Sequence, residues 1–154
     1  MPKQNRPMMI TIDDDPEIQA IIEYVGRSMG LHCKSLEPET ALEELNRTWN
    51  SPLIVLDINM PKCDAIEFLS RLSSFGDTGL HVILVSGAHP KIVELTENFM
   101  KAMGHVHVGT ILKPFGIEEL RKMLRPYVVS DEHSLDYEDR KVNRTENASL
   151  SRPG

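Results

Sequence analysis

Apolar and amphipathic segments alternate five times along the chain. Short apolar runs predict strands, at residues 8–12, 32–36, 53–57, 82–85 and 106–112. Each run is followed by a segment with apolar residues at helical spacing, at residues 16–29, 38–49, 65–75, 90–103 and 117–127. Strands joined by helical crossovers must run parallel, because each helix returns the chain to the same end of the sheet. The pattern therefore predicts a doubly wound α/β domain with a five-stranded parallel sheet and five helices.

The predicted helices begin and end at residues that suit helix ends. Asp15 can cap the first helix, Pro16 suits its first turn, and Gly30 ends it. In that helix one apolar stripe is formed by Ile18, Ile21, Ile22, Val25 and Met29. In the fourth helix, which begins at Pro90 and is closed by Gly104, one side is formed by Ile92, Leu95, Phe99 and Met103. Stripes of this kind predict the faces that pack against the sheet.

The length and composition indicate one globular domain. The 154 residues are enough for one core and too few for two ordinary domains, and 40% of them are apolar. We expect the domain to span residues 8–128, with a short extension at 1–7 and a disordered polar tail at 129–154. The tail has too few apolar residues to offset the conformational entropy lost on ordering.

Charge and hydropathy exclude several functions. The net charge of −6 argues against a nucleic-acid-binding surface and against a polybasic membrane anchor. No apolar run approaches the ~20 residues of a membrane helix, and the N-terminal segment lacks the apolar stretch of a secretion signal. We therefore expect a cytoplasmic protein with no nucleic-acid or membrane partner. Cys33 and Cys63 have neither metal-ligand spacing nor disulfide density, so both are expected to be reduced thiols.

Polar side chains follow four of the predicted strands at the point where each strand ends. Asp13 and Asp14 follow the first strand, Asp57 ends the third, Ser86 follows the fourth and Lys113 follows the fifth. Because the carboxyl ends of parallel strands share one edge of the sheet, these side chains are expected to converge there. Taken singly, each is equally well explained as a turn residue, a strand end or a helix cap. Their recurrence after four strands favours a shared site.

The acidic members of this set predict a magnesium site. Two carboxylates about 4 Å apart repel by roughly 4 kcal/mol at an effective dielectric near 20, so positive charge beyond that of Lys113 is needed. Carboxylate oxygens suit the hard cation Mg²⁺. We expect the ligands to be Asp14 and Asp57 through their carboxylates, Asp13 through water, and Asn59 through its backbone carbonyl.

Phosphoryl transfer is the chemistry that such a site supports. With Mg²⁺ bound, Asp57 is an oxygen nucleophile beside a cation that also holds a phosphoryl group. Ser86 and Lys113 can reach the other phosphoryl oxygens. The reaction depends mainly on in-line positioning and on neutralising the charge of these oxygens, and this set of residues provides both.

The same residues resemble the receiver domain of two-component response regulators. The likeness covers about residues 8–127 and rests on Asp13-Asp14, on Ser86, on Lys113-Pro114-Phe115, and on Asp57 within Leu-Asp-Ile-Asn-Met-Pro-Lys-Cys-Asp. The resemblance implies a flavodoxin-like sheet with strand order 2-1-3-4-5. It implies that Asp57 is the phosphoacceptor and that Asp13 and Asp14 are the Mg²⁺ pair. Ser86 would move to the phosphoryl oxygen and Lys113 would contact it. The donor would be a phosphohistidine on a sensor histidine kinase or on a histidine phosphotransfer protein.

Three positions depart from the pattern of that family. Ala65 stands where the family usually has glycine, and alanine tolerates a positive φ poorly. Thr110 occupies the place of the usual aromatic switch residue, so a rotating ring is not available to report movement of Ser86. Ala88 lies where some members carry a polar side chain that influences the attacking water.

The resemblance also predicts how the protein acts. No DNA-binding or catalytic partner domain is recognisable in the sequence, so we expect a stand-alone regulator rather than an enzyme, apart from catalysis of its own phosphorylation and dephosphorylation. By resemblance, its output surface is the fourth helix, fifth strand and fifth helix. Phosphorylation would change how this surface docks to another protein.

Three alternatives remain open. A haloacid-dehalogenase-like phosphatase also uses a strand-end aspartate, a hydroxyl, a lysine and Mg²⁺, but its nucleophile motif resembles Asp-x-Asp, where this chain has Asn59. A flavodoxin-like flavin binder needs a first loop that accepts phosphate, which Asp13-Asp14-Asp15 would repel. A degenerate receiver would keep the fold and serve as a docking module without being phosphorylated.

Overall fold

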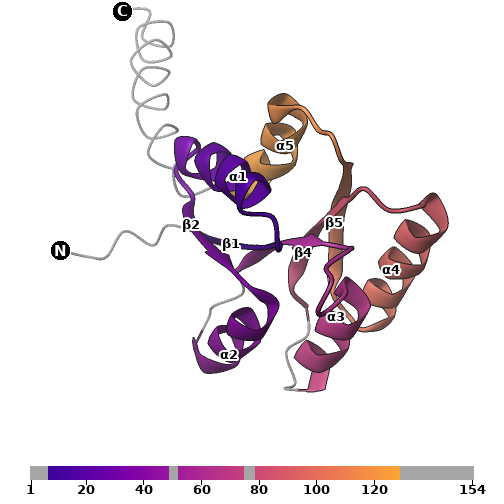
Figure 1. Ribbon diagram of the computed structural model, residues 1–154. Helices are drawn as coiled ribbons and strands as arrows, with labels where there is room; N and C mark the ends of the chain where they lie inside the picture. Colours follow the sequence, from indigo (N-terminus) through magenta and orange to yellow (C-terminus); the bar gives the residue numbers. More distant parts are fainter. Residues whose placement is uncertain (1–6, 49–51, 75–78, 129–154) are drawn as a thin grey trace, which may run out of the picture.

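The computed structural model describes residues 7–48, 52–74 and 79–128, and its strands and helices alternate along the chain (Figure 1). The strands are β1 (Met8–Ile12), β2 (His32–Leu36), β3 (Leu53–Asp57), β4 (His81–Ser86) and β5 (Val106–Leu112). The helices are α1 (Pro16–Ser28), α2 (Pro38–Thr48), α3 (Ala65–Ser74), α4 (Pro90–Ala102) and α5 (Ile117–Leu124), followed by the 3₁₀ turn η1 (Arg125–Tyr127). The predicted ends of two helices, at residues 49 and 75, and the expected tail at 129–154 lie outside the described residues.

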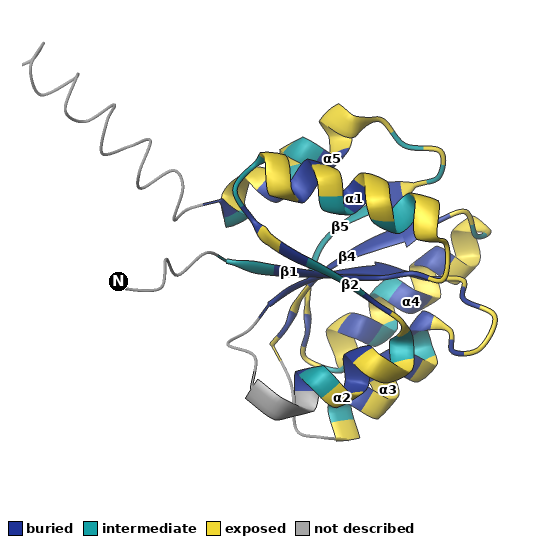
Figure 2. Ribbon diagram, turned by 60° about the vertical axis from the view of Figure 1, so that its left-hand side comes forward, coloured by how far each residue is buried: buried dark blue, intermediate teal, exposed yellow. Residues whose placement is uncertain are grey.

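All five strands pair in parallel, in the order β2-β1-β3-β4-β5, so the predicted fold and strand order are confirmed. Helices α1 and α5 cover one face of the sheet, and α2, α3 and α4 cover the other (Figure 2). Side chains alternate between the faces along each strand. The central strands are therefore apolar on both faces, which explains why Leu53–Asp57 is buried throughout.

Two cores hold the helices to the sheet. The larger core, on the side of α2, α3 and α4, contains among others Ile10, Ile54, Leu56, Phe68, Leu72 and Leu84. The core on the side of α1 and α5 contains among others Met9, Val25, Val55, Ile83, Ile111 and Leu120. Burying such side chains contributes about 1.5–3 kcal/mol each, and this fixes where each strand ends relative to its neighbours.

The predicted boundaries of α1 and α4 have the expected local causes. Asp15 accepts hydrogen bonds from the backbone N–H groups of Glu17 (2.9 Å) and Ile18 (3.5 Å), which caps α1. Gly30 and Gly104 follow the ends of α1 and α4 with φ values of 93° and 84°. Both values lie in the left-handed region that glycine adopts without strain and that ends helices.

Two predicted apolar faces are partly wrong. In α4 the buried side chains are Val93, Thr96 and Met100, whereas Ile92 and Leu95 of the predicted face are 48% and 62% exposed. The helix carries apolar residues on two sides, so spacing alone did not show which side meets the sheet. In α1, Ile21 is likewise exposed although its neighbours in the predicted stripe pack inward. Finally, α5 ends at Leu124, and Tyr127 lies in the 3₁₀ turn that follows.

Among the helices that the structure describes, none is both long enough and apolar enough to span a bilayer.

Candidate functional site

Three carboxylates meet at the carboxyl edge of the sheet. Asp13 and Asp14 lie in the loop after β1, and Asp57 is the last residue of β3, which pairs with β1. One carboxylate oxygen from each of the three residues lies within 4.8 Å of the others. Asp13 and Asp57 are only 2% and 3% exposed, whereas Asp14 is exposed. Two of the three negative charges are thus held nearly out of water, beside a third that opens to it.

Lys113 provides positive charge at the same place. It follows β5, and its Nζ lies 3.4 Å from Oδ2 of Asp13 and 3.4 Å from Oδ2 of Asp57. Its own backbone N–H donates to the carbonyl of Ser86 over 2.7 Å, which fixes the start of the loop to the end of β4. The cluster contains three carboxylates and one ammonium, so it holds an excess of negative charge that favours binding of a cation.

The pKa values of the cluster reflect this arrangement. Burial raises the pKa of Asp13 from 3.8 to about 6, and the nearby Asp57 adds to the increase, while the N–H of Asp15 and the charge of Lys113 oppose it. Burial lowers the pKa of Lys113, but Asp57 and Asp13 more than compensate, so its pKa is raised above its usual value. Lys113 therefore stays protonated at neutral pH, whereas Asp13 takes up a proton in mildly acidic solution.

The loop that carries Asp13 is held from two sides. The backbone N–H of Asp15 donates to Oδ1 of Asp13 over 2.9 Å. From the first turns of α1, Nε2 of Gln19 donates to the carbonyl of Asp13 (2.7 Å) and to that of Leu36 (3.3 Å), at the ends of β1 and β2. Sequence reasoning missed Gln19, because nothing in the spacing of a single polar residue on α1 indicates that its amide reaches two strand ends.

Asp57 is oriented by its own turn. The backbone N–H of Asn59 donates to Oδ1 of Asp57 over 3.2 Å, and the N–H of Ile58 donates to the carbonyl of Val85 over 2.9 Å. Oδ2 of Asp57 faces Lys113. Asn59 itself is exposed. The hydrogen bond to Asp57 places the backbone of Asn59 beside the carboxylate cluster. That its carbonyl is a ligand of Mg²⁺ stays a prediction.

Ser86 lies next to this cluster with its side chain completely buried. It ends β4, which pairs with β3 and brings Val85 opposite Asp57. In this structure its Oγ accepts a hydrogen bond from the backbone N–H of Ala88 over 2.8 Å. The hydroxyl is therefore engaged with the β4–α4 loop.

Two of the three positions that depart from the family pattern, Ala65 and Thr110, lie in different elements. Ala65 is the first residue of α3, is completely buried, and donates its N–H to the carbonyl of Ile58 over 3.2 Å. A helical position tolerates a methyl side chain, so the absence of glycine does not prevent this loop from forming. Thr110 lies in the middle of β5, and its hydroxyl donates to Oε2 of Glu97 on α4 over 2.8 Å. The residue in the place of the family's usual switch residue is thus joined to α4 by a hydrogen bond.

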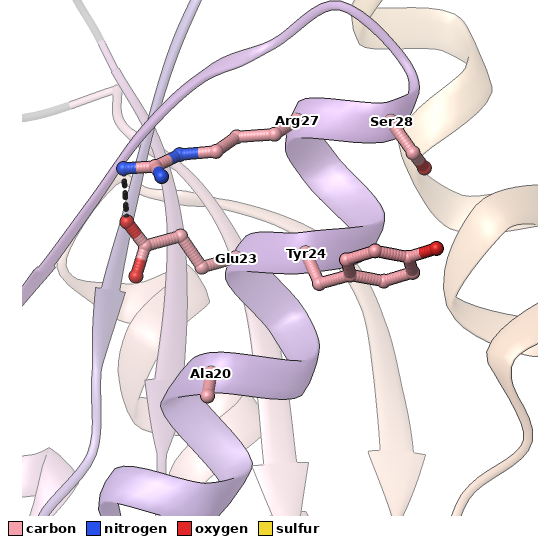
Figure 3. Close-up of a pocket in the computed structure, with 5 residues that line it drawn as sticks. All are labelled: Ala20, Glu23, Tyr24, Arg27 and Ser28. Carbon is pink, nitrogen blue, oxygen red and sulfur yellow. Dashed lines mark hydrogen bonds and ion pairs between the residues drawn. The ribbon is translucent and has the colours of Figure 1, made fainter.

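The described surface has one hollow beside the site and another on α1. One adjoins Asp14 and has a volume of about 320 Å³. It is lined from the β2–α2 loop, the start of α2 and the β3–α3 loop by Glu37, Pro38, Glu39, Met60, Pro61, Lys62 and Cys63. The other, of about 470 Å³, lies on the outer side of α1 and is lined by Ala20, Glu23, Tyr24, Arg27 and Ser28 (Figure 3). In this second hollow Glu23 pairs with Arg27, so its two charges balance each other. The first hollow reaches the site through Asp14, whereas none of the three carboxylates lines the second.

A doubly wound parallel sheet with acidic and lysine side chains at its carboxyl edge defines a class of α/β proteins that bind a cation or phosphate at this edge. Within that class the sequence matches the response regulator receiver domain over residues 9–125. The chain belongs to this family, whose members work in two-component signalling.

Individual relatives share about a quarter to a third of the aligned residues. The two-component response regulator ORR22 of Oryza sativa subsp. indica is 28% identical over 117 residues, which are 75% of this chain and 16% of the relative. The probable C4-dicarboxylate response regulator DctR of Bacillus subtilis is 28% identical over 121 residues, or 77% of this chain and 51% of the relative. A protein-glutamate methylesterase/protein-glutamine glutaminase of Anaeromyxobacter dehalogenans is 31% identical over 111 residues, or 70% of this chain and 30% of the relative. The chain thus spans about half or less of the length of these relatives.

Solved structures share the fold. A response regulator from Colwellia psychrerythraea superposes with a TM-score of 0.69 at 22% identity, covering 82% of this chain and 98% of that one. The chemotaxis protein CheY4 of Vibrio cholerae superposes with a TM-score of 0.62 at 21% identity, covering 79% of this chain and 98% of that one. At this level of identity the likeness concerns the fold alone.

Proposed function

We propose that this receiver domain accepts a phosphoryl group on Asp57, with Mg²⁺ bound by the acidic cluster, and passes the signal on by docking to another protein. The observation that carries the proposal is the meeting of three carboxylate oxygens within 4.8 Å, with Lys113 shared between Asp13 and Asp57. An oxygen-only, net negative donor set fits a hard divalent cation. The donor we propose is a phosphohistidine on a sensor histidine kinase or on a histidine phosphotransfer protein.

The residues present have distinct roles in such a reaction. Bound Mg²⁺ would supply positive charge for the phosphoryl oxygens, and its proposed ligands are Asp13, Asp14, Asp57 and the carbonyl of Asn59. An oxygen of Asp57 attacks phosphorus, forming a P–O bond as the P–N bond to the donor imidazole breaks and its electrons return to the ring. Lys113, already 3.4 Å from Asp57, neutralises a further oxygen. The site near Asp14 stays open to solvent, so a donor protein has access to it.

Ser86 then connects the reaction to the protein surface. We propose that its hydroxyl leaves the N–H of Ala88 and donates to a phosphoryl oxygen, which moves the start of α4. The face formed by α4, β5 and α5 carries exposed apolar side chains, namely Ile92, Leu95, Val106, Leu112 and Ile117. Such a face suits a protein partner whose docking depends on phosphorylation.

The test is formation of an acyl-phosphate adduct. We expect the purified protein to gain one phosphoryl group from a small acyl-phosphate donor in the presence of Mg²⁺, seen by intact-protein mass spectrometry, and to lose this ability in Asp57→Ala. Chelation with EDTA should have the same effect as the substitution. Absence of the adduct from the wild-type protein, or an adduct undiminished in Asp57→Ala, would contradict the proposal.

The same experiment separates the alternatives. Sustained turnover of a phosphate ester would favour a phosphatase over a regulator. A domain that binds Mg²⁺ but takes no phosphoryl group from either an acyl phosphate or a phosphohistidine donor would be a docking module without phosphorylation. The regulator predicts one phosphoryl group per chain and no sustained turnover.

A further inference from the structure

A β-bulge in β5 places two polar side chains on the same face of the sheet. Val82 of β4 pairs with His107, but the next residue, Ile83, pairs with Gly109, so β5 contains one extra residue. Residues three apart in a regular strand face opposite sides. Because of the extra residue, His107 and Thr110 both lie on the face of Val82, beneath α4.

Glu97 of α4 joins these two side chains. The hydroxyl of Thr110 donates to Oε2 of Glu97 over 2.8 Å. Since that hydroxyl has only one hydrogen, it accepts in turn from Nε2 of His107, 2.8 Å away. The same nitrogen lies 3.2 Å from Oε2 of Glu97. The side chains of His107 and Glu97 are 15% and 25% exposed, so these polar contacts are only partly solvated.

The three side chains lie between the phosphorylation site and the exposed face of α4. Thr110 pairs with Leu84, which is two residues before Ser86 and on the same face of β4. Helix α4 begins at Pro90, shortly after the loop in which Ala88 bonds to Ser86. Glu97 lies in the middle of that helix, on the sheet side with Val93 and Met100. Figure 1 shows α4 beside β5, so a displacement of α4 against this strand stretches or breaks the hydrogen bond between Thr110 and Glu97 and the contact between His107 and Glu97.

We propose that Glu97, Thr110 and His107 form a polar clasp that holds α4 against β5 and opposes the movement that phosphorylation starts at Ser86. In this chain the strength of the clasp, rather than rotation of an aromatic ring, sets how readily the α4–β5 face rearranges. The inference rests on the proposed phosphorylation of Asp57. In the clasp, Glu97 accepts the hydrogen bond from the hydroxyl of Thr110, and His107 contacts both side chains.

The clasp is tested by loosening it and measuring how easily the domain switches. The probe is beryllofluoride with Mg²⁺, an anion that mimics a phosphoryl group on a carboxylate, added to the full chain. The readout is the conversion of the backbone amide signals of Ala88, α4 and β5 in ¹H–¹⁵N NMR spectra. We expect Thr110→Val and Glu97→Gln each to lower the beryllofluoride concentration at half conversion by about tenfold, because each removes a hydrogen bond to a charged group or the charge itself.

A double variant and a control sharpen the result. Thr110→Val/Glu97→Gln should shift the midpoint no further than the stronger single variant, because both changes disrupt the same bond. Glu94→Gln removes the same charge from an exposed position one turn earlier on α4 and should leave the midpoint within twofold of wild type. If Thr110→Val does not fold, the beryllofluoride midpoint of Glu97→Gln alone tests the clasp, since glutamine retains the shape of glutamate.

The outcomes separate this inference from the proposed function. If beryllofluoride produces no change in the wild-type protein, or the same change in Asp57→Ala, then the proposed function fails. If the wild-type protein responds but the clasp variants have the midpoint of Glu94→Gln or a higher one, only the clasp is contradicted. A lowered midpoint in both clasp variants, with non-additive behaviour in the double variant, supports it.

Discussion

The carboxylate of Asp13 is buried, because the residue is only 2% exposed to solvent. In the metal-free protein its pKa is raised to about 6, first because burial disfavours the charged form and then because Asp57 repels it. In the unfolded chain the pKa returns to about 3.8. Between these two values the folded protein binds a proton that the unfolded chain has released. Asp13 therefore makes the folded state progressively less stable as the pH rises from about 4 to 6, and the loss is complete above pH 6.

Replacing this carboxylate should stabilise the metal-free protein. We expect Asp13→Asn to raise the free energy of unfolding by about 1–3 kcal/mol at pH 7, because it removes a buried charge that Lys113 only partly balances. At pH 4 the gain should nearly vanish, since Asp13 is then protonated in the folded protein. Urea denaturation in EDTA at both pH values measures this. The prediction is contradicted if the gain is equal at both pH values, and Mg²⁺ should reduce the gain if Asp13 helps to bind the cation.

At the scale of elements, Gln19 joins α1 to the ends of two strands. Its Nε2 lies 2.7 Å from the carbonyl of Asp13 and 3.3 Å from that of Leu36, and it holds the backbone from which the first two carboxylates project. Residues that orient metal ligands from outside the coordination sphere typically change metal affinity about 10–100-fold when they are replaced. Gln19 holds the backbone rather than a ligand side chain, so we place its effect at the lower end of this range.

We expect Gln19→Met to weaken Mg²⁺ binding about tenfold with little loss of fold, since methionine has a similar length but no amide. Isothermal titration calorimetry with MgCl₂ on the metal-free protein gives the affinity, and urea denaturation in EDTA gives the stability. The matched control is Glu17→Gln, an exposed position two residues earlier on the same helix. An unchanged affinity, or a loss of affinity that only follows a loss of stability, would show that Gln19 does not position the site.

Periodicity accounts for most of the elements, and topology accounts for most of the site. The prediction of β4 missed one residue at each end, because His81 and Ser86 are not apolar. The convergence of Asp13, Asp57 and Lys113 followed from parallel strands alone, since parallel strands end at one edge. These features depend on many residues together, so single exceptions do not disturb them.

Other features depend on single contacts and were not predictable. The extra residue in β5 leaves no mark in hydrophobic periodicity, so the meeting of His107 with Thr110 appeared only in the structure. The prediction of which side of α4 packs against the sheet was wrong, because the polar Thr96 is completely buried on that side. Its hydroxyl donates to the carbonyl of Ile92 over 2.7 Å. A threonine that satisfies its own hydroxyl within the helix can face a core, and hydrophobicity scales do not show this.

For the molecule as a whole, Val128 is the last buried residue that the structure describes. That residue is 6% exposed and follows the 3₁₀ turn whose Tyr127 hydroxyl lies 2.7 Å from Nδ1 of His81, at the start of β4. The rings of His81 and Tyr127 also meet edge to face, with centroids 5.5 Å apart. These contacts attach the segment after α5 to the opposite end of the sheet from the acidic cluster. Residues up to 128 should therefore suffice for a folded receiver domain.

Two truncations test this boundary. The free energy of unfolding of a chain ending at Val128 should lie within about 0.5 kcal/mol of that of the full protein, because this chain retains every buried residue that the structure describes. It should also take up a phosphoryl group on Asp57 to the same extent. A chain ending at Leu124 loses the burial of Val128 and the contact of Tyr127 with His81, which together contribute about 2–4 kcal/mol. Urea denaturation compares the three chains. Equal stability of the two truncated chains would show that the core closes before Val128, and a large loss in the longer one would place part of the fold beyond it.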